Sequence, residues 1–199
     1  MALITFPDIV PNACWFQLRT FSRDLRSPIT GTRDSVQLPG TRWTARLEFV
    51  NLENAEWREL EGFVSAMRGR VNTVLLRDFR VSAKRGQASG TITVTGAAEA
   101  QTVTLAGIGG GTPSFRRGDL FTVDSHMHQV LAEVTHSGGS VSVAISPPLR
   151  AAKSAVEVSF FEPKCLMQLA SDDEGAFMGV PGWDGPEVQP VTINFVEAL

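Results

Sequence analysis

The sequence predicts a mainly β protein that carries one packed α-helix and is divided into two units. Three observations lead to this fold class. Several segments alternate apolar and polar residues with a period of two, one segment has the period of a helix, and the region after residue 83 consists of short apolar runs separated by turn formers. The 199 residues are enough to bury a sizeable core.

The clearest strand is the segment "TRWTARLEFVN". Its odd-numbered positions from Trp43 to Phe49 are apolar and its even-numbered positions from Arg42 to Glu48 are polar, which is typical of a half-buried strand. The segments "CWFQLRTFS" before it and "VNTVLLRDF" after residue 70 are predicted to be further strands.

The segment "WRELEGFVSAMRGRV", residues 57–71, is predicted to be a helix. Asn51 or Asn54 is expected to cap its start, and Gly69 to end it. An apolar stripe with helical spacing covers one side only, so we expect the helix to lie on the face of a sheet; the stripe consists of Leu60, Phe63, Val64 and Met67.

The rest of the chain predicts an inserted unit. The polar segment "SAKRGQASG" is typical of a junction, and the short strands after it favour a small β-barrel or β-sandwich. The last strand, with Val191, Ile193 and Phe195, needs a partner for its backbone groups, and an early strand is the simplest one. We therefore expect a discontinuous β-sandwich domain made of 1–83 and 153–199, and an inserted peripheral β domain made of 84–152.

Charge and cysteine content narrow the functional classes. The net charge is −3, and 18 basic and 21 acidic residues are mixed along the chain, which disfavours a binder of nucleic acid or of anionic membranes. Cys14 and Cys165 lie in apolar surroundings, which favours free buried thiols over a disulfide. Neither a signal peptide nor a membrane span is predicted, so we expect a protein made in a reducing cytoplasm.

Few segments suggest chemistry. His126 and His128 with Asp124 could offer a metal two imidazoles and a carboxylate, but a solvated strand face is the favoured interpretation. Likewise, "GIGGGT" (107–112) favours a hairpin tip over a phosphate loop, and "SDDEG" (171–175) a solvated turn over a calcium site. No Gly-x-Ser-x-Gly motif is present. We predict no catalytic residues, cofactor or metal, and therefore no enzyme.

The Gly/Pro-rich loop "EGAFMGVPGWDGPEV" offers a candidate protein interface. Phe177, Met178 and Trp183 lie in it without an alternating pattern that would bury them. Aromatic side chains on loops mark protein interfaces or sugar platforms, and the protein interface is the favoured interpretation.

Several motifs, taken in order, resemble those of one family. "RWTARLEFVNLENAEWRELEGFVSAMRGRVNTVLLRD" has a strand-borne W-x-A, a helix that ends in F-x-x-x-x-R-G, a strand and an aspartate. "GDLFTVDSHMHQVLAEVTHSGGSVSVAISPPLRAA" opens with G-D and closes with P-P-L-R, and the chain ends in "FVEAL". From Arg42 to Leu199 the sequence resembles the distal tail proteins of siphophages, the phages with long tails.

The resemblance implies a β-sandwich "belt" domain with one helix, and a second peripheral domain with a shape similar to a galectin or an oligonucleotide-binding fold. It implies a structural protein of the virion tail tip, a homo-hexameric ring in the baseplate. Its partners would be the tail tube protein, the tail hub protein and receptor-binding proteins, with no catalytic residue, cofactor, nucleic-acid contact or membrane insertion. The alternative is a carbohydrate-binding module that contacts host surface sugars through Phe115 and Phe121 of the inserted domain or through the 176–185 loop. A cell-wall hydrolase is disfavoured, because no catalytic set is found.

Overall fold

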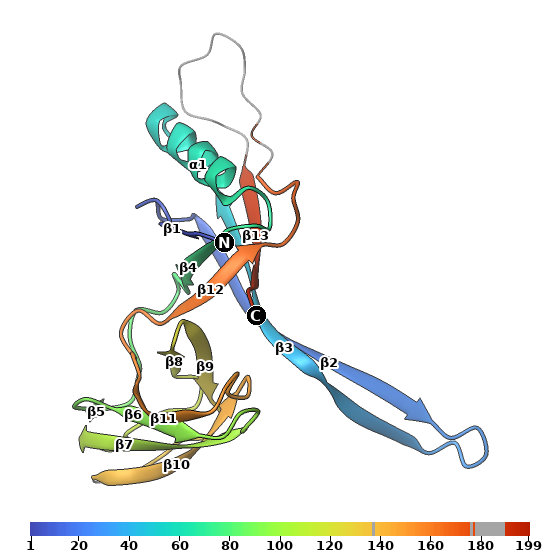
Figure 1. The fold of residues 1–199 in the computed structure, drawn as a ribbon, viewed down its shortest axis with the longest axis vertical. Coiled ribbons are helices and arrows are strands. Elements are labelled where there is room, and N and C mark those ends of the chain that lie inside the picture. The colour runs from blue at the N-terminus through green and yellow to red at the C-terminus, as the bar shows by residue number, and fades with distance from the viewer. Residues whose placement is uncertain (137, 176, 178–189) are drawn as a thin grey trace.

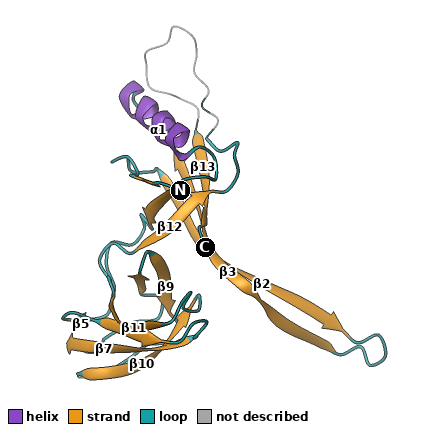
Figure 2. Cartoon of the chain, in the orientation of Figure 1, coloured by secondary structure: helices purple, strands orange, loops and turns teal. Residues whose placement is uncertain are grey.

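The computed structural model describes residues 1–136, 138–175, 177 and 190–199. Within these residues the protein is mainly β, with two sheets and one helix, as the sequence predicts (Figure 1). Figure 2 shows the two sheets and the helix at one end of the molecule.

The first sheet has six strands in the order β1-β4-β12-β13-β3-β2. Their bounds are β1 (Leu3–Ile4), β2 (Ala13–Arg26), β3 (Arg33–Phe49), β4 (Thr73–Arg77), β12 (Lys164–Leu169) and β13 (Val191–Glu197). The terminal strand β13 pairs antiparallel with the early strand β3, from Val191 opposite Phe49 to Val196 opposite Thr44. This confirms the pairing that the sequence predicts for the last strand.

The second sheet contains seven strands and follows the order β11-β6-β7-β10-β9-β8, with β5 paired to β7. The bounds are β5 (Ala88–Ser89), β6 (Thr93–Gly96), β7 (Thr102–Gly110), β8 (Leu120–Val123), β9 (His126–Val130), β10 (Gly139–Ser146) and β11 (Lys153–Glu157). Because β11 pairs with β6, residues 153–157 belong with this sheet, whereas the sequence-based boundary at 153 assigns them to the first domain. The division into two domains otherwise stays a prediction.

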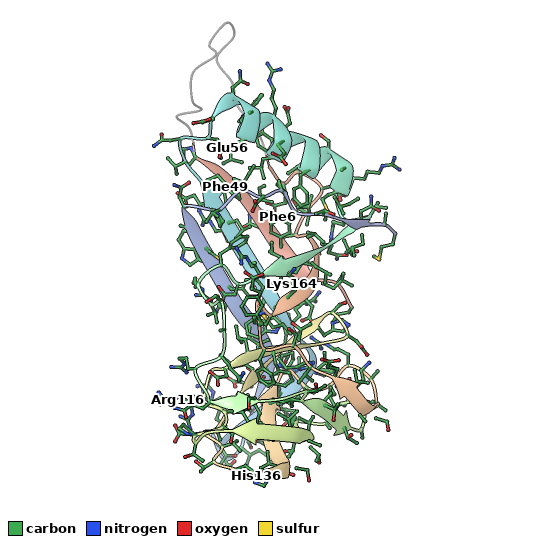
Figure 3. The ribbon with its side chains drawn as sticks, turned by 90° about the vertical axis from the view of Figure 1, so that its left-hand side faces the viewer. Phe6, Phe49, Glu56, Arg116, His136 and Lys164 are labelled. Carbon is green, nitrogen blue, oxygen red and sulfur yellow. The ribbon has the colours of Figure 1, made fainter. Side chains whose placement is uncertain are left out.

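The helix α1 (Asn54–Met67) covers one face of the first sheet. Its cap is Glu53, which forms a capping box with Glu56, so the predicted asparagine caps are wrong. Three of the four predicted stripe residues, Leu60, Phe63 and Met67, are buried. Figure 3 shows Phe6 and Phe49 among the side chains beneath the helix, and the rings of Phe6 and Phe63 meet edge to face at 5.1 Å between centroids.

The glycine-rich segment at 107–112 is not a hairpin tip. Gly107 to Gly110 belong to β7, where Ala88 and Ser89 pair with Gly110 and Gly109. Gly107 has a φ of +78°, and a Cβ there would lie 2.2 Å from the carbonyl oxygen of Thr91. The glycines therefore permit close approach of neighbouring backbones, and the predicted hairpin tip is wrong.

Candidate assembly interface

The most unusual feature of the fold is a long hairpin formed by β2 and β3. Beyond Arg19 on β2 and Arg42 on β3 the two strands leave the sheet and project from the molecule as an arm (Figure 1). In the arm, Phe21 to Arg26 of β2 pair with Leu38 to Arg33 of β3. Each of these two stretches is about 20 Å long, at roughly 3.3 Å per residue. We call residues 20–41 the arm.

A break in the pairing register separates the arm from the sheet. Arg19 lies opposite Arg42, but the next pair is Phe21 and Leu38, so extra residues of β3 bulge out at this point. Gly40 in the bulge has a φ of +102°, a conformation that glycine adopts without strain. The guanidinium groups of Arg19 and Arg42 lie 5.2 and 5.7 Å from the centre of the Phe21 ring.

One face of the arm carries most of its large apolar side chains, although it is exposed. Phe21 lies opposite Leu38 and Arg23 lies opposite Val36, so these four side chains share a face, and Leu25 continues it by strand alternation. Leu25, Val36 and Leu38 are 47%, 45% and 42% exposed. We call Phe21, Leu25, Val36 and Leu38 the arm stripe.

The opposite face of the arm is polar and bonded to itself. Ser22 lies opposite Gln37, and Asp24 lies opposite Ser35. The Ser35 hydroxyl donates to Asp24 at 2.5 Å, and Arg33 forms an ion pair with the same carboxylate. The arm is therefore amphipathic, yet neither core cluster of the described residues includes a residue of the arm. A two-stranded hairpin is marginally stable in water, and an exposed apolar stripe is typical of a contact with another molecule.

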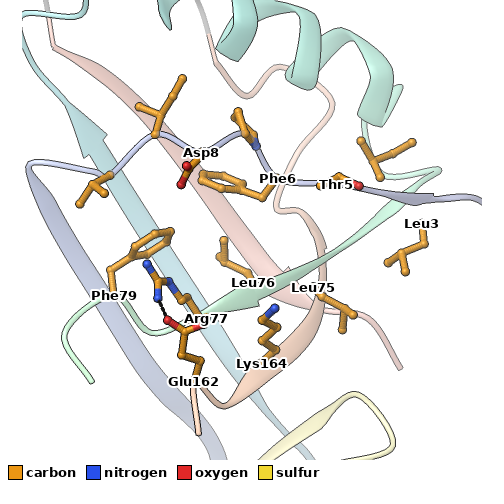
Figure 4. A pocket seen from close by; sticks show the side chains of 14 residues that line it. Leu3, Thr5, Phe6, Asp8, Leu75, Leu76, Arg77, Phe79, Glu162 and Lys164 are labelled. Atoms are coloured by element: carbon orange, nitrogen blue, oxygen red, sulfur yellow. Dashed lines mark hydrogen bonds and ion pairs between the residues drawn. The ribbon is translucent and has the colours of Figure 1, made fainter. Parts of the chain in front are cut away.

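A groove lies at the opposite edge of the same sheet (Figure 4). Among the described residues, the edge strand β1 pairs with Thr73 and Val74 of β4, and the remaining part of β4 has no strand partner on that side. The groove of about 460 Å³ runs between this edge and the N-terminal segment, and its lining includes Leu3, Phe6, Val10, Leu76 and Phe79. We call it the edge groove.

A buried carboxylate fixes the base of the arm. The side chain of Glu197 is fully buried; one of its oxygens accepts from the Trp43 backbone N–H at 2.9 Å and from Arg150 at 2.7 Å. His126 lies 3.1 Å from the other oxygen. Arg150 also donates to the carbonyl oxygen of Thr41 at 2.6 Å, so it ties the arm to the loop after β10.

Further contacts join the second sheet to this point. The indole N–H of Trp43 donates to the carbonyl oxygen of Met127 at 2.6 Å. Met127 and Leu120, from β9 and β8, are buried in the core of the first sheet. We call Glu197, Arg150, His126 and Trp43 the latch, because they connect the C-terminal strand, the base of the arm and the second sheet.

The hydrogen bonds of the latch set the pKa of Glu197. Burial alone would raise the pKa of Glu197, but hydrogen bonds from His126, the Trp43 backbone and Arg150 outweigh burial and lower that pKa. Nearby, burial lowers the pKa of His128 to about 4, although its Nδ1 lies 2.8 Å from the carbonyl oxygen of Pro147. Glu197 is therefore charged and His128 neutral at pH 7.

The structure describes only part of the interface predicted on the 176–185 loop. The Phe177 ring packs edge to face against Trp57 of α1, at 6.0 Å between centroids. Met178 and Trp183 lie outside the described residues. The interface role of this loop therefore stays a prediction.

The histidines differ from the solvated face that the sequence favours. His128 is 1% exposed and packs against Phe121, so that interpretation is wrong for this residue. His126 faces Glu197, and Asp124 binds Lys153 at 2.5 Å. The described part of the chain contains no cluster of three or more metal-ligating side chains.

Two other segments contribute contacts within the first unit. In the "SDDEG" loop, Asp172 accepts from the Arg70 backbone N–H at 3.1 Å, and Glu174 accepts two hydrogen bonds of 2.9 Å from Asn194.

Cys14 and Cys165 are free, as the sequence favours, and burial raises the pKa of both thiols.

Comparisons leave the family open. The chain matches no protein-family model, and no curated protein matches its sequence. Within the residues that the structure describes, no helix is long and apolar enough to cross a membrane.

The latch predicts a strong effect of Arg150→Met on stability. The variant leaves a buried carboxylate without its main counter-charge, which costs on the order of 3 kcal/mol. Arg33→Met is the matched control, because its ion pair with Asp24 has side chains that are 72% and 44% exposed. We expect the control to lose much less stability, because an ion pair that is open to solvent contributes little. Urea unfolding compares the two, and equal losses would show that the latch does not stabilise the fold.

Acid should destabilise the protein in two separable steps. Unfolded His128 takes up a proton near pH 6.5 whereas the folded form resists until about pH 4, so the free energy of unfolding falls as the pH is lowered through this window. The slope approaches about 1.4 kcal/mol per pH unit for one proton. The contribution of Glu197, whose folded pKa lies below the ordinary 4.5, is lost only as the pH falls further.

His128→Gln separates the two steps. This variant should flatten the pH dependence between 6.5 and 4.5 while it keeps the loss at lower pH. Urea unfolding at a series of pH values measures both. An unchanged slope in the upper window would assign it to another group.

Proposed function

We propose that this protein is a structural component of the tail tip of a long-tailed phage and assembles with copies of itself into a ring. In this role the ring connects the tail tube to the hub and to receptor-binding proteins. The observation that carries the proposal is the arm, because a projecting hairpin with an exposed apolar stripe is typical of a contact with another molecule. Its stripe becomes buried when copies associate.

The placement of the family-like motifs supports the same proposal. Trp43 and Ala45, the W-x-A pair, lie on β3, and the F-x-x-x-x-R-G segment ends α1. Asp78 follows β4, and "FVEAL" contains the end of β13. Segments that are far apart in the sequence thus meet in one sheet with its helix, which is the arrangement that the resemblance implies for a belt domain.

The free edges of the first sheet also suit self-association. The sheet ends in β1 on one side and in β2 on the other, and α1 covers one face. Exposed sheet edges present unpaired backbone groups that a neighbouring chain can use. Head-to-tail contacts between unlike edges generate a closed ring when the rotation between copies closes.

The alternative, a sugar-binding module, loses its candidates in the inserted region. Phe115 and Phe121 are both fully buried, and their rings stack or tilt against Phe160. Neither ring can therefore form a platform for a sugar. We retain ring assembly as the proposed function.

A substitution on the arm tests the proposal. Val36→Lys with Leu38→Lys places two charges on the arm stripe, and we expect a folded monomer that no longer assembles. Native mass spectrometry should show the wild type as a ring, of about 129 kDa for six copies of the 21.5 kDa chain, and the variant near the mass of one chain. Circular dichroism confirms that the variant is folded.

The matched control carries the same charges on the same strand. Ser35→Lys with Gln37→Lys changes the polar face of the arm and should assemble like the wild type. Equal loss in both variants would point to the charge of the arm and not to its apolar stripe. A wild-type protein that stays monomeric at all concentrations, with tube and hub proteins present, would overturn the proposal.

A further inference from the structure

The polar face of the first sheet carries a group of arginines that the net charge of the chain does not reveal. Here β13, β3 and β2 are neighbours, and a groove of about 510 Å³ runs across them. Four arginines contribute to the lining of this groove: Arg19, Arg42, Arg46 and Arg70. Among the described residues, no aspartate or glutamate lines it. We call this surface the arginine face.

Strand pairing sets the order of the side chains on the arginine face. Three cross-strand pairs follow one another along β2 and β3: Trp15 with Arg46, Gln17 with Thr44, and Arg19 with Arg42. The guanidinium group of Arg46 lies 5.1 Å from the centre of the Trp15 ring. Trp15 is 49% exposed although it is a large aromatic residue. Charged, hydrogen-bonding and aromatic side chains are thus interleaved on one open surface.

Most of the positive charge on the arginine face has no counter-charge in the chain. Three of the four arginines form no ion pair within the described residues: Arg19, Arg42 and Arg70. Three carboxylates contact lining residues without lining the groove: Glu48 with Arg46, Glu174 with Asn194, and Asp172 with the backbone N–H of Arg70. The contact between Arg46 and Glu48 is 3.8 Å long and open to solvent, so it neutralises little of the charge.

Folding creates this concentration of charge. Basic and acidic residues are mixed along the sequence, which disfavours a nucleic-acid binder on composition alone. The arginine face takes its arginines from β2, from β3 and from the segment that follows α1. No cluster of basic residues is therefore visible in the sequence, although one forms on the sheet.

We propose that the arginine face binds single-stranded nucleic acid, with phosphates on the arginines and a base stacked on Trp15. The spacing favours an extended anion: Arg42 and Arg46 are four residues apart on one strand, about 13 Å at roughly 3.3 Å per residue, which is too far for one small anion. A basic groove combined with an exposed aromatic ring is the chemistry with which sheet faces hold single strands. The inference does not rest on the proposed function, because none of these residues belongs to the arm stripe.

The composition of the face favours nucleic acid over an acidic protein. Charged residues are depleted at the centre of protein–protein interfaces, whereas Arg42 and Arg46 stand here on β3, the middle one of the three strands. Surfaces that bind nucleic acid are more polar and more positive. A duplex is disfavoured, because its bases are already stacked and paired and leave no free base for Trp15.

Binding of a labelled oligodeoxythymidine tests the inference. A length of about 12 nucleotides lies within the site size of single-strand binders, and fluorescence anisotropy at low salt measures the dissociation constant. Trp15→Ala should raise this constant at least about fivefold, because a base loses its stacking partner, and Trp15→Phe should recover part of the loss. Phe161→Ala is the matched control, since it removes a ring that is 71% exposed but lies outside the arginine face, and it should leave the constant unchanged.

The salt dependence of binding separates the arginines from the indole. For a single strand, the logarithm of the binding constant falls with the logarithm of the salt concentration by about 0.7 for each phosphate contacted. Arg42→Gln should weaken binding and reduce this slope by about 0.7, whereas Trp15→Ala should weaken binding at an unchanged slope. Arg116→Gln removes the same charge from the segment between β7 and β8 and should change neither quantity.

Four outcomes would overturn the inference. The first is a wild-type protein that does not bind the oligonucleotide at low salt, and the second is an equal loss from Arg42→Gln and Arg116→Gln, which would show general charge attraction only. The third is tighter binding of a duplex of the same length. The fourth is tighter binding of polyglutamate at equal charge, which would assign the face to an acidic protein. Ring assembly is not affected by any of them, because these variants leave the arm stripe unchanged.

Discussion

The buried carboxylate of Glu197 is the constraint on which the arrangement of the molecule depends. A charge without solvent must be compensated by fixed partners, and here they come from three separate parts of the chain: Trp43 at the base of the arm, His126 on β9 and Arg150 after β10. None of these segments can move away alone without leaving the carboxylate unsatisfied. This one carboxylate on the last strand therefore connects the second sheet and the base of the arm to the first sheet, beside the contacts of Trp43, Met127 and Leu120.

The core of the first sheet follows from the alternation of apolar and polar residues along its strands. The residues of β3 from Trp43 to Phe49 alternate in burial as they alternate in polarity, and α1 covers the apolar face. The opposite face carries the polar residues of β3, and within the described residues the edge strands β1 and β2 have no further strand beside them. The proposed ring uses those edges, and the covered face gives each copy its own stability.

The sequence predicts those parts of the fold in which burial leaves a periodic record. The helix, the strand from Trp43 to Phe49 and the pairing of the terminal strand follow from apolar spacing and from the need to satisfy backbone groups. The arm also alternates apolar and polar residues, but this pattern does not show that its apolar residues stay exposed outside the core. Glu197 was missed for the opposite reason: a single charged residue at the end of a strand reads as solvated, and only its partners from distant segments show that it is buried. The edge groove depends on how far β1 reaches along β4, a register that composition does not encode.

The latch also has a consequence for assembly. Arg150 binds the carbonyl oxygen of Thr41 and the carboxylate of Glu197 together, directly beside the bulge at which the arm leaves the sheet. The direction of the arm is thus set by a residue of the loop after β10, next to the second sheet. In a ring whose closure depends on the angle between copies, a small rotation of the arm changes that angle at every contact. In the proposed ring, Arg150 of the loop after β10 therefore helps to hold the angle at which neighbouring copies would meet.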